Sequence, residues 1–164
     1  MFYTKTAGIF FECANSPFEK IEAINKSGIC VLDTKSGALQ FSLLIKGFEF
    51  EKSLMQEHFN ENYMESDRFP KSIFKGKILN NSAIDYLKTG EYTAKVNGQL
   101  EIHGKTNEVS VTGKVTVKEN KIFLNAKFDI LLDNYNINVP SLVKDKISKN
   151  IHITVDGSLE ILKR

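Results

Sequence analysis

The chain has 164 residues with 22 basic and 20 acidic side chains, which gives a net charge of +2. This length favours one domain that can bury a core without disulfides or metals. The charges are well mixed, so no basic stripe indicates a nucleic-acid partner. No apolar run approaches the ~20 residues of a membrane-spanning helix, so no integral membrane segment is expected.

The first part of the chain predicts a β-hairpin followed by a third strand. Segments 10–13 and 21–32 are the two arms of the hairpin, and Cys13 and Cys30 within them do not face each other, so both thiols are expected to be unbridged. A turn at 35–37 then leads to segment 41–50. The apolar residues of that segment change parity at Gly47, which predicts a bulge that keeps both sets inward.

A short helix is predicted over residues 54–63. Ser53 and Gln56 have the spacing of a capping box, with Ser53 as the N-cap. Met55, Phe59 and Tyr63 follow at helical spacing. Pro70 cannot lie inside a continuing helix, so segment 69–79 is predicted to be the next strand.

The second half of the chain alternates apolar and polar residues with period two, the pattern of strands with one buried face. Segments 92–102, 109–117, 122–132 and 151–161 show it, with turns at 103–105 and 118–121 and with Gly98 interpreted as a bulge or bend. A second short helix is predicted at 141–147, after Pro140. Together these segments make about eight strands, which favours an all-β antiparallel barrel or sandwich.

Two histidines are candidates for a role in ligand binding or catalysis. His58 lies near the apolar side of the predicted helix, and His103 ends a strand. A helix over one barrel mouth, with a histidine facing inward, could bind a polar head group. The alternative is a histidine that hydrogen-bonds a backbone carbonyl and holds the helix to a turn. The spacing of the histidines predicts no metal site, and no serine or cysteine has an identifiable base, so no enzyme is expected.

The aromatic residues are biased toward phenylalanine, with 12 Phe and no Trp. Many of them fall on or near positions expected to face inward: Phe41, Phe48, Phe50, Phe59, Phe69, Phe74 and Phe128. Such an interior suits a lipid pocket, and it equally suits a core filled by side chains.

Two segments resemble the signature of the YceI-like family. Residues 56–59 (QEHF) and 68–74 (RFPKSIF) are similar to its Asp-x-His-Leu and Tyr-Pro-x-x-x-Phe segments. Residues 98–106 (GQLEIHGKT) resemble its Gly-x-Leu-Thr-Ile-His-Gly-Val-Thr segment. Residues 48–52 (FEFEK) and 134–140 (NYNINVP) are similar to a Bacteroidetes-type subgroup. Gln56 and Glu101 depart from the pattern, which has an acid and a threonine at these places.

The resemblance implies one domain over 1–164, an extended lipocalin-like eight-stranded barrel that binds a long apolar amphiphile and does no catalysis. The ligand would be an isoprenoid, an isoprenoid quinone or a fatty-acid-like lipid, with its head near helix 54–63. It also implies a periplasmic or secreted protein whose signal peptide is absent from this chain. No metal or cofactor is expected. The residues expected to bind the ligand are Phe41, Phe48, Phe50, Met55, His58, Phe59, Phe74, His103 and Phe128.

A second hypothesis belongs to a different class. The barrel would be filled by side chains, and the protein would act as a structural or interaction module through its surface, with a homodimer as one form.

Overall fold

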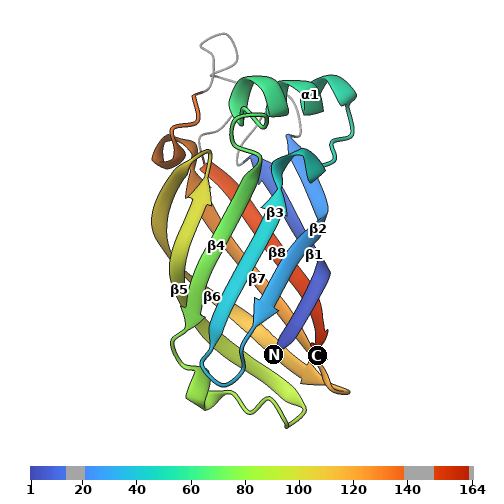
Figure 1. Cartoon of the computed structure of the whole chain (residues 1–164), viewed down its shortest axis with the longest axis vertical. Coiled ribbons are helices and arrows are strands. Elements are labelled where there is room, and N and C mark those ends of the chain that lie inside the picture. Colours follow the sequence, from blue (N-terminus) through green and yellow to red (C-terminus); the bar gives the residue numbers. More distant parts are fainter. Residues whose placement is uncertain (14–20, 139–149, 163–164) are drawn as a thin grey trace.

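A closed barrel of antiparallel strands forms the body of the molecule (Figure 1). The computed structural model describes residues 1–13, 21–138 and 150–162. Each strand pairs with its neighbours in the chain, and β1 pairs with β8 to close the sheet. The strands are β1 (Phe2–Cys13), β2 (Glu22–Leu32), β3 (Ala38–Leu44), β4 (Lys71–Ile78), β5 (Gly90–Ile102), β6 (Lys105–Lys118), β7 (Lys121–Leu131) and β8 (Asn150–Ile161).

Period-two alternation explains which face of each strand is buried. In β7, Ile122 and Leu124 are buried, while the residues between and after them, such as Asn125, are exposed. The predicted turns are also present. Glu119 and Asn120 both have positive φ, as a two-residue type I′ hairpin turn requires. The predicted all-β antiparallel barrel is therefore confirmed.

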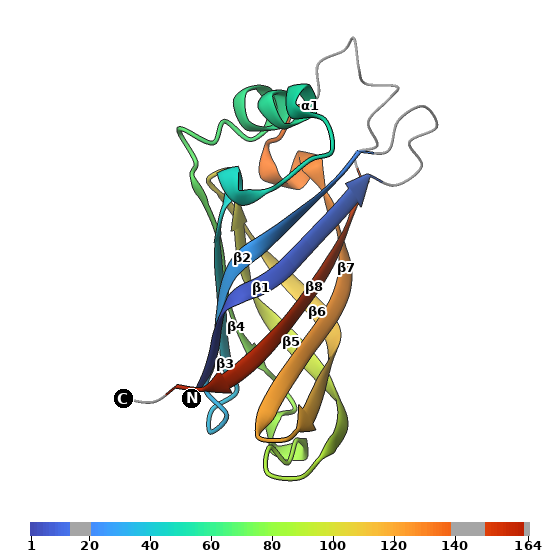
Figure 2. The same cartoon turned by 90° about the vertical axis from the view of Figure 1, so that its right-hand side faces the viewer.

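One end of the barrel is covered by a short helix (Figures 1 and 2). It consists of α1 (Ser53–His58), which continues as the π-helical turn η2 (Phe59–Tyr63), and confirms the helix predicted at 54–63. The predicted capping box is wrong, because Lys52 is the N-cap and makes no side-chain cap bond. The Gln56 side chain instead reaches back and accepts a hydrogen bond from the Phe50 N–H at 3.1 Å.

Three further helical turns lie at strand ends: η1 (Ile45–Gly47), η3 (Asn81–Ala83) and η4 (Leu132–Tyr135). The second predicted helix, 141–147, lies outside the described residues. Within the part of the chain that the structure describes, no helix is long and apolar enough to cross a bilayer.

Two predicted bulges are wrong for different reasons. At Gly47 the strand has already ended, and the η1 turn redirects the chain so that Phe48 is buried. At Gly98 the register of β5 runs on without a shift. Gly98 lies opposite Gly76, and a Cβ on either glycine would come within 2.6 Å of the Phe74 ring. Glycine is thus required there to make room for an aromatic ring above the sheet.

The pairing of β6 with β7 ends before either strand does. Strands β6 and β7 pair from Lys118–Lys121 only as far as Gly113–Ala126. Beyond this pair, residues 105–112 of β6 pair only with β5, and residues 127–131 of β7 pair only with β8. We call the place where these two segments diverge the β6–β7 split. Its far end lies beside η4, where the Asn107 side chain donates a hydrogen bond to the Asn134 carbonyl at 2.6 Å.

Candidate ligand-binding cavity

The barrel encloses a cavity of about 430 Å³. This volume falls within the range of about 300–1,000 Å³ that is usual for small-molecule sites. Most of the lining is aliphatic or aromatic, and it comes from inward positions such as Leu39 on β3, Val96 on β5 and Val155 on β8. The alternating pattern that builds the strands therefore also builds a continuous apolar interior.

The structure places eight of the nine predicted site residues in the cavity lining: Phe41, Phe48, Phe50, Met55, His58, Phe59, Phe74 and Phe128. His103 lies outside this lining. The sequence reasoning did not single out several lining residues, among them Cys13, Tyr63, Val109, Val111 and Leu132. For Val109, Val111 and Leu132 the signal was available, because each shares the parity of the buried positions in its segment.

Aromatic rings fill the space under the helix. Phe59 stacks against Phe11 with ring centroids 5.5 Å apart, and its ring lies 4.9 Å from that of Phe50 and 5.8 Å from that of Phe48. Such contacts stabilise beyond the area they bury, by about 0.5–1.5 kcal/mol per pair. This aromatic cluster packs the helix against the barrel at the helix-covered end of the cavity.

Cys13 and Cys30 are both free thiols, as expected. Cys13 lines the cavity below the helix, and burial raises its pKa to about 11. Burial also raises the pKa of Cys30, which has no exposed surface, to about 12. Both thiols are therefore protonated at neutral pH and behave as small apolar groups.

His58 lies at the edge of the cavity rather than within it. The residue is exposed, and its Nδ1 is 2.8 Å from the Asn62 amide nitrogen one turn further along the helix. That bond holds the ring along the helix. His58 therefore contributes to the cavity lining, as the sequence suggested, but most of the residue is exposed to solvent.

His103 instead joins three segments at the same end of the barrel. Its Nε2 is 2.6 Å from a Glu65 carboxylate oxygen, and its Nδ1 is 3.1 Å from the Tyr135 carbonyl oxygen. The Phe69 ring packs against it at 4.7 Å, and only 9% of the side chain is exposed. The two ring nitrogens thus contact oxygen atoms of two segments that are distant in the sequence. This is the alternative considered for the histidines, a side chain that holds a turn through a backbone carbonyl.

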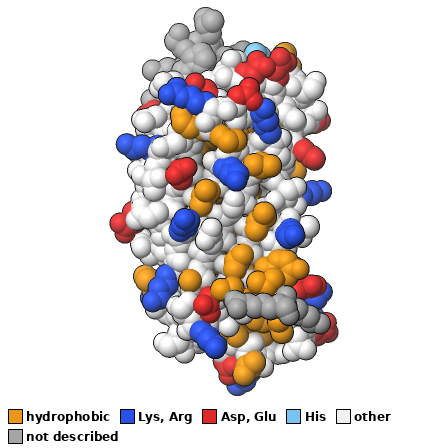
Figure 3. Space-filling model, viewed as in Figure 1, with side chains coloured by type: hydrophobic (Ala, Val, Ile, Leu, Met, Phe, Trp, Pro, Cys, Tyr) orange, Lys and Arg blue, Asp and Glu red, His pale blue; other side chains and the backbone are white. Residues whose placement is uncertain are grey.

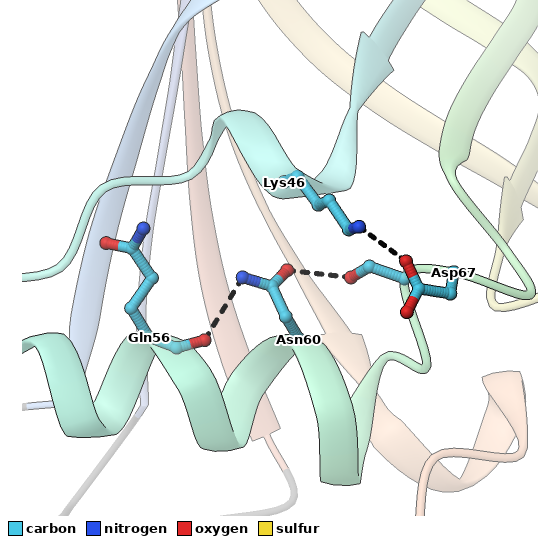
Figure 4. A network of polar contacts seen from close by, with 5 residues as sticks. Lys46, Gln56, Asn60 and Asp67 are labelled. Atoms are coloured by element: carbon cyan, nitrogen blue, oxygen red, sulfur yellow. Dashed lines mark hydrogen bonds and ion pairs between the residues drawn. The ribbon is translucent and has the colours of Figure 1, made fainter.

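A second set of polar contacts ties the helix to the neighbouring loops (Figure 4). The Asn60 amide donates to the Gln56 carbonyl at 3.1 Å, and its oxygen accepts from the Ser66 hydroxyl at 2.7 Å. Lys46 of η1 forms an ion pair with Asp67 in the loop after the helix. Both groups of that pair are largely exposed, so it contributes little to stability.

The charges on the outer surface differ between the wall and this end. Figure 3 shows basic and acidic side chains interspersed along the wall, while acidic groups gather near the helix-covered end. The helix and the loop after it carry Glu57, Glu61, Glu65 and Asp67. Among the described residues, no group of three or more His, Cys, Asp and Glu side chains converges on a point that could hold a metal ion.

An antiparallel barrel closed around an apolar cavity defines a class of protein that holds a small apolar molecule inside a β-barrel. The sequence pattern of the YceI-like domain matches residues 9–159. The chain therefore belongs to the YceI-like family, as its two histidine segments predicted. Among curated proteins, none matches the chain.

Solved structures share the fold at low sequence identity. A polyisoprenoid-binding domain from Saccharophagus degradans has a TM-score of 0.80 at 10% identity, with 98% of each chain covered. BcnA from Burkholderia cenocepacia has a TM-score of 0.77 at 14% identity, covering 94% of this chain and 96% of its own. A YceI protein from Campylobacter jejuni has a TM-score of 0.63 at 14% identity, covering 84% and 81%. At these identities the likeness establishes the fold.

Proposed function

We propose that this protein is a carrier that holds a long apolar amphiphile, such as an isoprenoid, an isoprenoid quinone or a fatty-acid-like lipid, inside its barrel. The observation that carries the proposal is the apolar cavity of about 430 Å³, which the inward side chains line but do not fill. Family membership and the likeness to a polyisoprenoid-binding domain support it.

The proposed contacts are mainly aromatic. Phe41, Phe74 and Phe128 would contact the middle of an apolar chain, because they line the cavity from β3, β4 and β7. Phe48, Phe50, Met55 and Phe59 would contact the part below the helix, with His58 at the cavity edge. His103 would act as a positioning residue, because its ring atoms bond to Glu65 and Tyr135.

The energetics require few polar contacts. Burial contributes about 0.8 kcal/mol per CH₂ group, so a chain of ~20 carbons gains more than the roughly 4–15 kcal/mol that association costs. Selectivity for the chain itself would then be loose. Because most of the described lining is aliphatic or aromatic, we propose binding without catalysis.

Native mass spectrometry of the purified protein tests the carrier function. The expected result is one or more mass additions that are lost on organic extraction and that the extract identifies as lipids. A protein that stays at its apo mass, and that also fails to take up a neutral apolar probe such as 1-N-phenylnaphthylamine, would contradict it. That outcome would favour a structural or interaction module with a closed interior.

We also propose that the protein works in the periplasm or outside the cell. Membership of the YceI-like family supports this location. Fractionation of the native host, followed by immunodetection, tests it: signal in the periplasmic or secreted fraction is expected, and signal confined to the cytoplasmic fraction would contradict it.

A further inference from the structure

The β6–β7 split brings the cavity close to the outer surface. Gly113 and Ala126 form the last pair before the strands part, and both lie at inward positions. Because neither has a side chain larger than a methyl group, no bulky side chain lies between the cavity and the outer surface at this pair. Lys114 and Asn125, which have outward parity, also contribute to the cavity lining at this place.

A polar hollow lies on the outer surface where the strands part. It has a volume of about 280 Å³ and is lined by Thr93, Thr112, Gly113, Lys114, Asn125, Ala126 and Lys127. We call it the lysine hollow. Gly113, Lys114, Asn125 and Ala126 line both the lysine hollow and the cavity. A single molecule could therefore place a polar group in the first and an apolar chain in the second.

The lining of the lysine hollow favours a negative charge. It offers two ammonium groups, an amide and two hydroxyls, and none of its residues is acidic. Lys127 forms no ion pair with any described residue, although its side chain is exposed. The Lys114 Nζ lies 3.9 Å from a Glu91 carboxylate oxygen, and both side chains are 66% exposed. An ion pair this exposed is weak. Both ammonium groups can therefore bind an anion, since the weak contact of Lys114 with Glu91 costs little to replace.

The helix-covered end differs from the lysine hollow. Aromatic rings cluster beneath the helix. The charges at this end are mixed, because Lys46 pairs with Asp67, His103 contacts Glu65, and Lys52 belongs to the cavity lining. The head group was expected there from the sequence, but the lysine hollow joins the cavity with two lysines and no acidic residue in its lining. We propose that the amphiphile carries a phosphate or carboxylate head that binds in the lysine hollow, with its tail in the barrel. This rests on the proposed carrier function.

Competition between a neutral probe and lipids with matched tails tests the assignment. The delipidated protein is loaded with 1-N-phenylnaphthylamine, which is displaced by hexadecyl phosphate, hexadecanoate or hexadecan-1-ol. In the K114Q/K127Q variant, the Kd for the two anionic lipids is expected to rise about fivefold to tenfold. The Kd for hexadecan-1-ol should stay within about twofold, since the alcohol carries no charge and glutamine keeps most of the aliphatic stem that Lys114 contributes to the lining.

The matched control is K75Q/K77Q, which removes two exposed lysines from β4, away from the split. This control should leave all three affinities unchanged, and the loss at K114Q/K127Q should shrink at high salt. Equal weakening in the two variants would overturn the assignment. Displacement of hexadecyl phosphate by equimolar inorganic phosphate would overturn it in favour of a free-anion site. If the wild type takes up neither the probe nor the alcohol, the carrier function itself fails.

Discussion

Two regions of the cavity wall, the helix-covered end and the β6–β7 split, are lined by different kinds of side chain. At the helix-covered end, aromatic rings, the His103–Glu65 pair and the Asn60 network hold a helix against the barrel. At the β6–β7 split, the last paired positions carry glycine and alanine, and lysines lie outside them. Large interlocking side chains close a barrel, and small ones leave its interior within reach of the surface. The contrast predicts that substitutions at the first end change stability, and those at the second change ligand selectivity.

The largest effect is expected from Phe59→Ala, which removes the ring at the centre of the aromatic cluster. Because the ring is partly buried, we expect a loss of about 2–4 kcal/mol in the free energy of unfolding, measured by urea denaturation with circular dichroism. Leu54→Ala on the same helix is the control, since Leu54 is 63% exposed and should cost less than about 0.5 kcal/mol. Similar losses for the two variants would show that the cluster does not hold the helix.

His103→Gln is expected to have the next largest effect. It removes the charge-assisted bond to Glu65, and the expected loss of stability is about 1–2 kcal/mol, since Glu65 is 43% exposed. Hydrogen exchange of the helix and of η4 should rise in this variant. His58→Gln is the matched control, because His58 is exposed and its hydrogen bond is to Asn62 of the same helical segment. A greater loss for His58→Gln would contradict the positioning role of His103.

A smaller effect is expected on the alkylation of Cys13, which lines the cavity below the helix. Its raised pKa, about 11, leaves little thiolate at pH 8, so iodoacetamide should react slowly. A bound lipid should slow the reaction further, by at least ~3-fold, since only the thiolate reacts and the lipid restricts access. Peptide mass mapping separates Cys13 from the fully buried Cys30. An alkylation rate that lipid leaves unchanged would mean that the chain does not reach this end.

The smallest effect concerns the β7 side of the split. The outer-face contact between Asp129 and His152, at 2.5 Å, joins this edge of β7 to β8, and its hydrogen bond lowers the pKa of Asp129 from 3.8. A carboxylate with a lowered pKa stabilises the fold above its ordinary pKa, and this contribution is lost as the pH falls through the lowered value. The Tm of Asp129→Asn should therefore lie slightly below wild type at pH 6, and the difference should shrink as the pH falls below 3.8 and vanish below the lowered pKa. A difference that grows on acidification would contradict this account.

Most of the barrel could be predicted from the sequence, because each strand signal is local. Ile122 to Leu132 alternate over a whole strand, and Glu119-Asn120 fits a tight turn. The split could not be predicted, because Val109 and Val111 keep the same alternation whether or not a partner strand lies beside them. Gly98 was misinterpreted for a similar reason. A Cβ at position 98 would collide with the Phe74 ring, which belongs to another strand.

The kinds of residue that line the cavity could be predicted from the sequence, but the position of His103 could not. The inward phenylalanines follow from parity, and all of those proposed as ligand contacts line the cavity. His103 was expected beside the ligand because it follows an apolar strand. Its position in a tight turn with positive φ directs the ring to Glu65 and Tyr135 instead, which are distant in the sequence.

A crystal structure of the protein purified without delipidation would show directly whether the barrel holds a lipid. We expect a continuous tube of electron density inside the barrel, running from beneath Phe59 past Phe74 and Phe128, with a head group beside Lys114 and Lys127. A barrel whose interior is filled by repacked side chains, or by isolated waters alone, would contradict it.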